Sequence, residues 1–109
     1  MTQTLGIGAV FSASHRATPD GPLHGHSYEV IVWFKAPVDG DRARREVEEV
    51  VSKLDHTDIT GHGVAEDLAE WLGGMILWFT PQFDGIQPFR VDVNRPLERV
   101  YATWTRDPA

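Results

Sequence analysis

The sequence predicts an α+β domain whose elements follow the order strand, strand, helix, helix, strand, strand. Two observations predict it. Stretches with the alternation or composition of strands occur at the two ends of the chain, within residues 5–36 and 89–105. Apolar residues with the three- and four-residue spacing of helices occupy the middle, within residues 42–79. Strands kept apart from a central block of helices are typical of the α+β class.

The first two strands are predicted at Leu5–His15 and His26–Ala36. In the first, every second residue is apolar up to Ala13, which is the pattern of a strand with one buried face. Turn-forming residues between Ala17 and Pro22 predict a loop. The second strand is apolar on both faces through Val30–Phe34, so we expect both faces to lie against protein, helices on one side and another subunit on the other.

The two helices are predicted at 42–54 and at about 64–79. The first has its apolar stripe on one face and charged residues on the other, which is typical of a helix lying on a core. In the second, the pair Gly73-Gly74 weakens the helical prediction locally. The last two strands are predicted at 89–93, by alternation, and at 97–105, by the high content of β-forming residues.

Composition limits the classes of protein that this chain can represent. Its 109 residues predict a single domain spanning 1–109. The net charge of -6 disfavours nucleic acid and anionic membranes as partners, and the absence of cysteine excludes disulfides and thiolate ligands. The sequence has neither an apolar run of about 20 residues nor a signal-peptide pattern, so we expect a cytoplasmic location. So small a domain buries limited surface alone, and oligomer formation is expected.

Three histidines predict a metal site. His24 and His26 are two residues apart on a strand, so their side chains project from the same face. His15 ends the preceding strand, and a hairpin would bring its imidazole across to the other two. Three imidazoles with an open fourth position form the ligand set of a catalytic zinc site. A His-x-His pair alone also arises by chance in a chain with five histidines, so the prediction depends on His15.

These residues also carry a family resemblance. The segments Phe11-Ser12-Ala13-Ser14-His15 and Leu23-His24-Gly25-His26-Ser27-Tyr28 are similar to the zinc-site signature of the 6-pyruvoyl-tetrahydropterin synthase and 6-carboxy-tetrahydropterin synthase family. The resemblance extends from about Phe11 to Val93. It implies the tunnelling fold (T-fold), in which a four-stranded antiparallel sheet carries two helices on one face. It also implies a zinc-dependent lyase with a pterin-like ligand, assembled as a homo-hexamer, a dimer of trimers with active sites between subunits.

The resemblance assigns further roles. His15, His24 and His26 match the family's zinc ligands, and Leu54-Asp55-His56 matches the segment that supplies a catalytic Asp and His. Asp20 stands where the family has its catalytic Cys. Each of these has a structural alternative, since Asp20 lies among turn formers and a histidine favours the C-terminal end of a helix.

The ligand-binding positions depart from the family. Glu66 matches a family glutamate at the start of the second helix. Asn94 or Arg95, depending on the register, replaces the glutamate that holds the pterin, and Glu98 or Glu66 would have to substitute for it. Three hypotheses therefore stand side by side: a zinc-dependent lyase acting on a dihydroneopterin-triphosphate-like substrate, a catalytically silent pterin- or purine-binding paralogue, and a structural hexamer with a vestigial site.

Overall fold

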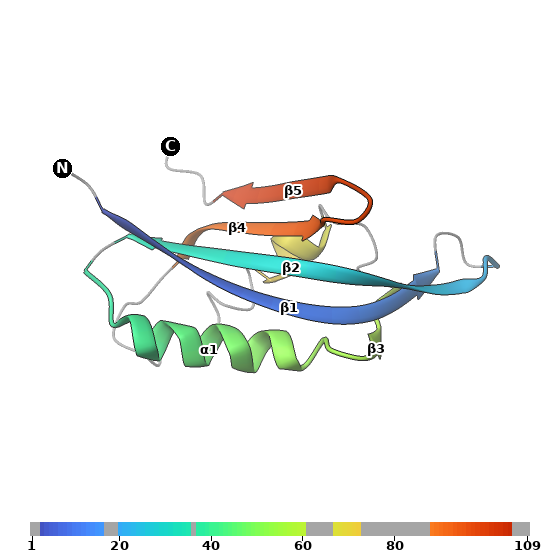
Figure 1. Ribbon diagram of the computed structural model, residues 1–109, viewed down its shortest axis with the longest axis horizontal. Helices are drawn as coiled ribbons and strands as arrows, with labels where there is room; N and C mark the ends of the chain where they lie inside the picture. Colours follow the sequence, from blue (N-terminus) through green and yellow to red (C-terminus); the bar gives the residue numbers. More distant parts are fainter. Residues whose placement is uncertain (1–2, 17–19, 36, 61–66, 73–87, 106–109) are drawn as a thin grey trace.

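The computed structural model describes residues 3–16, 20–35, 37–60, 67–72 and 88–105. Five strands form one sheet in the order β3-β1-β2-β4-β5. Their bounds are β1 Thr4–Arg16, β2 Leu23–Lys35, β3 Thr57–Asp58, β4 Pro88–Arg95 and β5 Val100–Thr105. All neighbours are antiparallel except β3, which runs parallel to β1 over two residue pairs. The two longest strands, β1 and β2, form a long hairpin (Figure 1).

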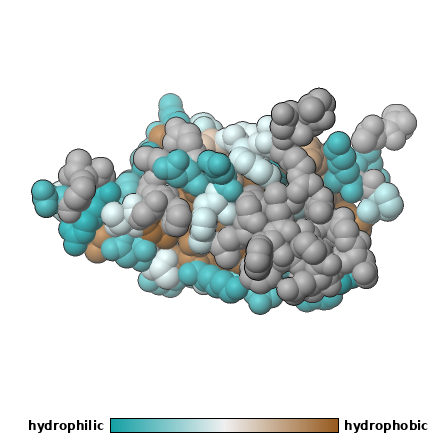
Figure 2. Space-filling model, turned by 180° about the vertical axis from the view of Figure 1, so that it is seen from behind, coloured by the Kyte–Doolittle hydropathy of each residue, from teal (hydrophilic) through white to brown (hydrophobic). Residues whose placement is uncertain are grey.

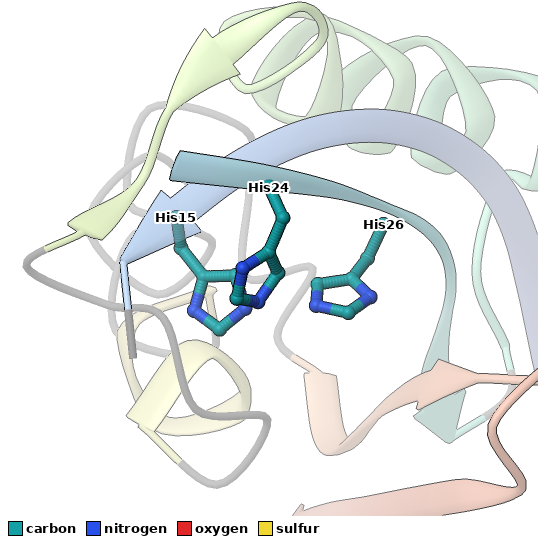
Figure 3. Close-up of side chains that lie close together, drawn as sticks. All are labelled: His15, His24 and His26. Carbon is teal, nitrogen blue, oxygen red and sulfur yellow. The ribbon is translucent and has the colours of Figure 1, made fainter. Parts of the chain in front are cut away.

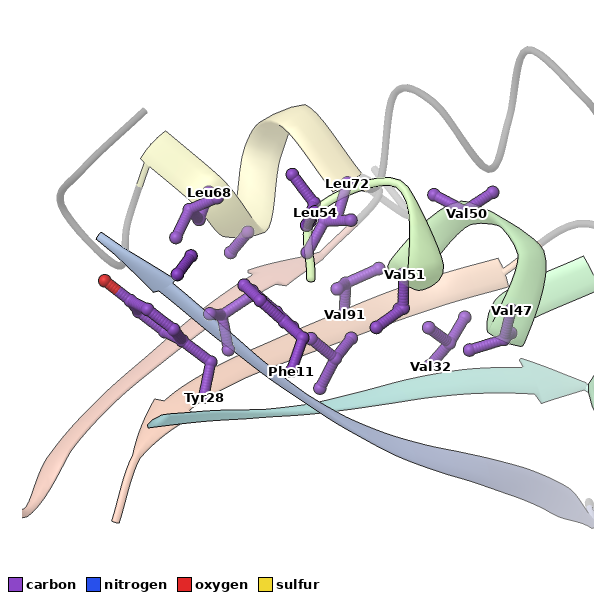
Figure 4. Close-up of a cluster of buried hydrophobic side chains, with 14 of the residues drawn as sticks. Phe11, Tyr28, Val32, Val47, Val50, Val51, Leu54, Leu68, Leu72 and Val91 are labelled. Carbon is purple, nitrogen blue, oxygen red and sulfur yellow. The ribbon is translucent and has the colours of Figure 1, made fainter. Parts of the chain in front are cut away.

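One face of this sheet carries the helical layer. Helix α1 (Gly40–Ser52) runs along β1 and β2, and residues 67–72 form a second helical segment on the same side (Figures 1 and 4). The side chain of Asp39 caps α1 by accepting hydrogen bonds from the backbone nitrogens of Asp41 and Arg42. Such a cap satisfies donors that the first turn leaves free. The predicted α+β fold class, with helices on one face of an antiparallel sheet, is confirmed.

The core lies between the sheet and the helices. Alternate residues of β1, β2 and β4 point into it, as the pleat requires. They meet the apolar stripe of α1 and the helical segment 67–72, as Figure 4 shows. Phe11 and Tyr28 stack with their ring centroids 4.9 Å apart, near the end of the sheet where the histidines lie. The largest fully buried side chains include Tyr28, Phe34, Leu68, Leu72, Val32 and Val47.

The other face of the sheet is more polar than the sequence predicts. Ile31 and Trp33 of β2 are half-buried on this face. The Asp92 carboxylate is buried beside them and accepts hydrogen bonds from the Trp33 indole (2.9 Å), from Arg90 Nε (2.9 Å) and from the Thr103 hydroxyl (2.8 Å). Burial by itself raises the pKa of Asp92, but these three donors outweigh it and the pKa is lowered. Side chains of this chain therefore already cover part of the outer face.

The view from behind shows a similarly mixed surface. Hydrophilic side chains alternate there with small apolar areas (Figure 2). Val10 and Tyr101, on the outer face of the sheet, are among the most exposed large apolar side chains of the described residues. No helix within the described residues is long and apolar enough to cross a membrane.

Element boundaries differ from the predicted ones in physically simple ways. Strand β2 begins at Leu23 rather than His26, because the hairpin with β1 continues to the pair Arg16↔Leu23. A turn occupies residues 96–99, so β5 begins at Val100 rather than Leu97. The short β3 was not predicted, since two residues carry no periodic pattern. The predicted second helix lies largely outside the described residues.

Candidate metal centre

The hairpin brings the three histidines together. His15 and His24 are direct partners across β1 and β2, and His26 is two residues further along the same face of β2. Their rings converge in Figure 3, with centroid separations of 4.7, 4.7 and 5.0 Å. One nitrogen from each ring lies within 4.8 Å of the others. They project from the face that carries the core, so the cluster continues the buried row formed by Phe11 and Tyr28.

This donor set fits a zinc ion. Zinc–nitrogen bonds of about 2.0–2.1 Å in a tetrahedron place the nitrogens roughly 3.4 Å apart. The rings therefore need to close by no more than about an ångström and a half from their observed separation. The Nε2 atom of His15 is buried and has no hydrogen-bond partner among the described residues. Such an atom, facing two further imidazoles, is what a metal ligand presents before the ion binds.

The surroundings of His15 lower the pKa of its imidazole and so favour the neutral form, which can bind a metal. Burial lowers its pKa most, and the neighbouring His26, His24 and Arg95 lower it further, while Asp58 opposes the shift. The imidazole is therefore held in its neutral form at lower pH than an exposed histidine. A neutral imidazole has the lone pair that coordination requires.

His26 has an orienting partner. Its Nδ1 lies 2.7 Å from Oε1 of Glu98, which sits in the turn between β4 and β5. Because a carboxylate only accepts, Nδ1 carries the proton and the lone pair is on Nε2. This hydrogen bond also lowers the pKa of Glu98 more than any other contact does. A carboxylate behind a metal-binding histidine fixes its ring orientation and raises its basicity.

The sequence did not assign Glu98 this role. The sequence offers it only as a substitute for the pterin-holding glutamate, because its approach to His26 depends on the geometry of the β4–β5 turn. No signal in the sequence places a residue of that turn beside β2. The structure puts Glu98 beside the ring of His26 instead.

Asp55 and His56 follow α1 in a turn against β1. Asp55 Oδ1 accepts a hydrogen bond from the Ser12 backbone nitrogen (2.9 Å), and the His56 backbone nitrogen donates to Ser12 O (2.6 Å). His56 has a positive φ of 60°, and its exposed ring lies 3.5 Å from the Asp55 carboxylate. Since α1 ends at Ser52, neither residue lies in its last turn.

A hollow lies beside this turn and reaches His26, one of the three clustered histidines. It has a volume of about 460 Å³, and its lining includes His26, Glu98, His56 and Ser12. Its size falls within the range of small-molecule sites, about 300–1,000 Å³. One ligand could therefore touch both His26 and His56 from within this hollow.

The other residues predicted for the site do not all lie together. Asp20 lies exposed in the turn before β2, and Glu66 is outside the described residues. The Asn94 side chain donates a hydrogen bond to Glu29 (3.3 Å) on the outer face of the sheet. Arg95 points the other way, and its Nη1 lies 3.4 Å from His26 Nε2. Of the two alternatives for the replaced glutamate, Arg95 is the one that reaches the histidine cluster.

Comparisons with known proteins agree with the fold. The chain matches a solved 6-pyruvoyl tetrahydropterin synthase of Caenorhabditis elegans with a TM-score of 0.79 at 16% identity, covering 98% of this chain and 97% of that one. An uncharacterized protein of Wolinella succinogenes matches with a TM-score of 0.72 at 16% identity, covering 98% and 99%. A 6-pyruvoyl tetrahydropterin synthase of Plasmodium falciparum matches at 0.67 and 13%, covering 96% and 99%. At such identities the likeness shows the fold.

The sequence itself shows to which family the chain belongs. No curated protein matches the sequence significantly. A family model described as 6-pyruvoyl tetrahydropterin synthase, however, matches residues 5–80, which is well over half of the chain and includes all three clustered histidines. The resemblance seen in the histidine motif is thereby confirmed: the chain belongs to the 6-pyruvoyl tetrahydropterin synthase family.

Proposed function

We propose that the protein binds zinc through His15, His24 and His26 and uses this centre to bind a pterin-like small molecule. The observation that carries the proposal is the convergence of three imidazole nitrogens within 4.8 Å, in a chain of this family. The hydrogen bond from His26 to Glu98 supports it, because it leaves the Nε2 lone pair available for a metal.

The chain's own groups have separable tasks in this proposal. Bound zinc supplies Lewis acidity, which lowers the pKa of a ligand hydroxyl or polarises a carbonyl. The three histidines hold the ion, and Glu98 orients His26. His56 lines the same hollow as His26, and we assign it the movement of a proton to or from the ligand. Asp55, with one oxygen held by the β1 backbone, positions and polarises the His56 ring.

We further propose that the standard lyase reaction is weak or lost. Asp20, in place of a thiol, is exposed in a turn and has a shorter reach than a glutamate. At neutral pH an exposed carboxylate is a weaker base than a thiolate. Arg95, in place of a carboxylate, presents donors where the family's ligand needs an acceptor. Both replacements disfavour family-like turnover.

The proposed assembly is a homo-hexamer built as a dimer of trimers. Within the described residues β3 and β5 are the edges of the sheet, and unpaired edges favour association unless something covers them. Closing several sheets into a ring would pair such edges, and stacking two rings gives dihedral symmetry. In such an assembly the histidine cluster, Asp55 and His56 would lie near a subunit boundary.

The test is direct. The purified protein is loaded with zinc and incubated with dihydroneopterin triphosphate, and both binding and products are followed. We expect zinc-dependent binding, absent in His24→Ala, with little or no turnover. His56→Ala is the matched control, because this histidine is not in the cluster and its loss should leave zinc binding intact. Absence of zinc binding after loading would overturn the metal centre, and turnover at family-like rates would overturn the loss of the standard reaction.

A further inference from the structure

We propose that the ligand of the metal centre carries a carboxylate group, which is held by the guanidinium of Arg95 and the hydroxyl of Tyr28. The inference rests on the proposed metal centre and specifies the chemistry of the ligand beside it. It follows from buried polar atoms that have no hydrogen-bond partner among the described residues, and from the positive charge of Arg95 at this end of β4.

Three buried atoms around the centre lack hydrogen-bond partners among the described residues. They are His15 Nε2, the Tyr28 hydroxyl oxygen and Arg95 Nε. Tyr28 is only 1% exposed, and His15 only 6%. In native proteins most buried polar atoms are hydrogen-bonded, so several unpartnered ones at a single place indicate a missing ligand.

The three side chains that carry these atoms all lie near His26. The Tyr28 ring centroid lies 6.1 Å from that of His26, and Arg95 Nη1 lies 3.4 Å from His26 Nε2. Burial raises the pKa of Tyr28 and lowers that of His15, and the Arg95 charge then lowers the pKa of both. The guanidinium therefore lies beside His26, whose ring is in turn a neighbour of the Tyr28 ring.

Coordination of a metal frees Arg95 for a ligand. The lone pair on His26 Nε2 can serve either the Arg95 hydrogen bond or a metal ion, because the other ring nitrogen donates to Glu98. Once it binds a metal, the guanidinium has both its Nε–H and an Nη–H to offer. Nε–H shares one edge of the guanidinium with Nη2, and the freed Nη1–H shares the other edge with Nη2, so either edge offers the two donors that match the two oxygens of a carboxylate.

The donors also exclude a guanidine-like ligand edge. Arg95 is permanently charged and its N–H groups can only donate, whereas the Tyr28 hydroxyl can donate or accept. A ligand edge made of N–H groups would oppose these donors and leave its own hydrogens unpaired. The positive charge of Arg95 at the end of β4 therefore selects a negatively charged acceptor.

The experiment uses the intact protein loaded with Co²⁺, whose visible absorption reports a change in its coordination shell. The probe is lactate, which has a hydroxyl next to a carboxylate, and its neutral counterpart is lactamide. We compare wild type with Arg95→Gln and Tyr28→Phe, and with Arg44→Gln as a matched control, since Arg44 is an exposed arginine of α1. Circular dichroism first shows that each variant is folded.

We expect lactate to change the cobalt spectrum and lactamide to bind at least about 10-fold more weakly, because the amide lacks the charge that Arg95 recognises. Arg95→Gln should lower lactate affinity about 10-fold or more, and Tyr28→Phe should lower it less, since a neutral hydrogen bond is the weaker one. Arg44→Gln should behave as wild type. Arg95→Gln should not lower the affinity for cobalt, because the substitution removes a positive charge that repels the metal ion.

The outcomes separate the two proposals. If cobalt binds but lactate and lactamide bind with equal affinity, the carboxylate inference is wrong and the metal centre stands. The same conclusion follows if Arg95→Gln retains the wild-type affinity for lactate. If cobalt does not bind at all, both are wrong.

Discussion

Removing the Glu98 carboxylate should weaken metal binding while leaving the fold intact. Its Oε1 accepts a hydrogen bond of 2.7 Å from His26, and its side chain is 38% exposed, so the core does not depend on it. Glu98→Gln keeps an acceptor oxygen but loses the charge, whereas Glu98→Ala removes both. Because partners that orient metal-binding histidines typically change metal affinity 10–100-fold, we expect a loss of about 10-fold for Gln and about 100-fold for Ala.

Zinc affinity is measured by competition with a chromophoric chelator at fixed pH and ionic strength. Glu48→Gln is the matched control, because it removes another exposed carboxylate, from α1, away from the histidine cluster. Equal affinities for wild type and both Glu98 variants would refute the orienting role. Equal losses in the Glu98 and Glu48 variants would instead indicate a general effect of net charge.

Four further outcomes are expected. The purified protein should carry about one zinc per chain by atomic absorption, and His24→Ala should carry almost none. Gly6→Ala should lower the free energy of unfolding in urea by about 1–3 kcal/mol, because the new Cβ would lie 2.9 Å from the Trp33 ring. The Asp92 carboxylate, whose pKa is lowered, stabilises the fold above its ordinary pKa of 3.8. The stability advantage of wild type over Asp92→Asn should therefore disappear as the pH falls through the lowered folded-state pKa, which unfolding curves at several pH values will show. Light scattering at micromolar protein should give several times the 12.2 kDa chain mass, and a monomer would contradict the proposed hexamer.

The alternation of apolar residues was sufficient to predict the hairpin and the meeting of the histidines. Once Phe11 and Ala13 are assigned to the buried face, the pleat puts His15 on it too. The same rule could have separated Asn94 from Arg95. Val91 and Val93 are buried, so Arg95 continues the inner row and Asn94 belongs to the outer face.

Features that depend on turns could not be predicted. The contact between Glu98 and His26 requires a turn in which Arg99 takes a positive φ of 59°, and nothing in the local sequence demands that conformation. The turn that holds His56 at a positive φ is likewise fixed by hydrogen bonds to Ser12, distant in sequence. The polar network of Asp92 on the outer face was missed because alternation reports burial but does not identify partners.

The core and the histidine cluster share one face of the sheet, so the register of β2 against β1 controls both. A shift of β2 by one residue against β1 would turn Val30 and Val32 out of the core and at the same time move His24 and His26 to the opposite surface. The two losses cannot occur separately through register. A variant that still folds cooperatively therefore keeps its imidazoles together, and if it binds no metal, the cause lies in the ligands or in the groups that touch them. Conversely, added zinc should protect the hairpin against unfolding, because only the folded sheet brings the three nitrogens together.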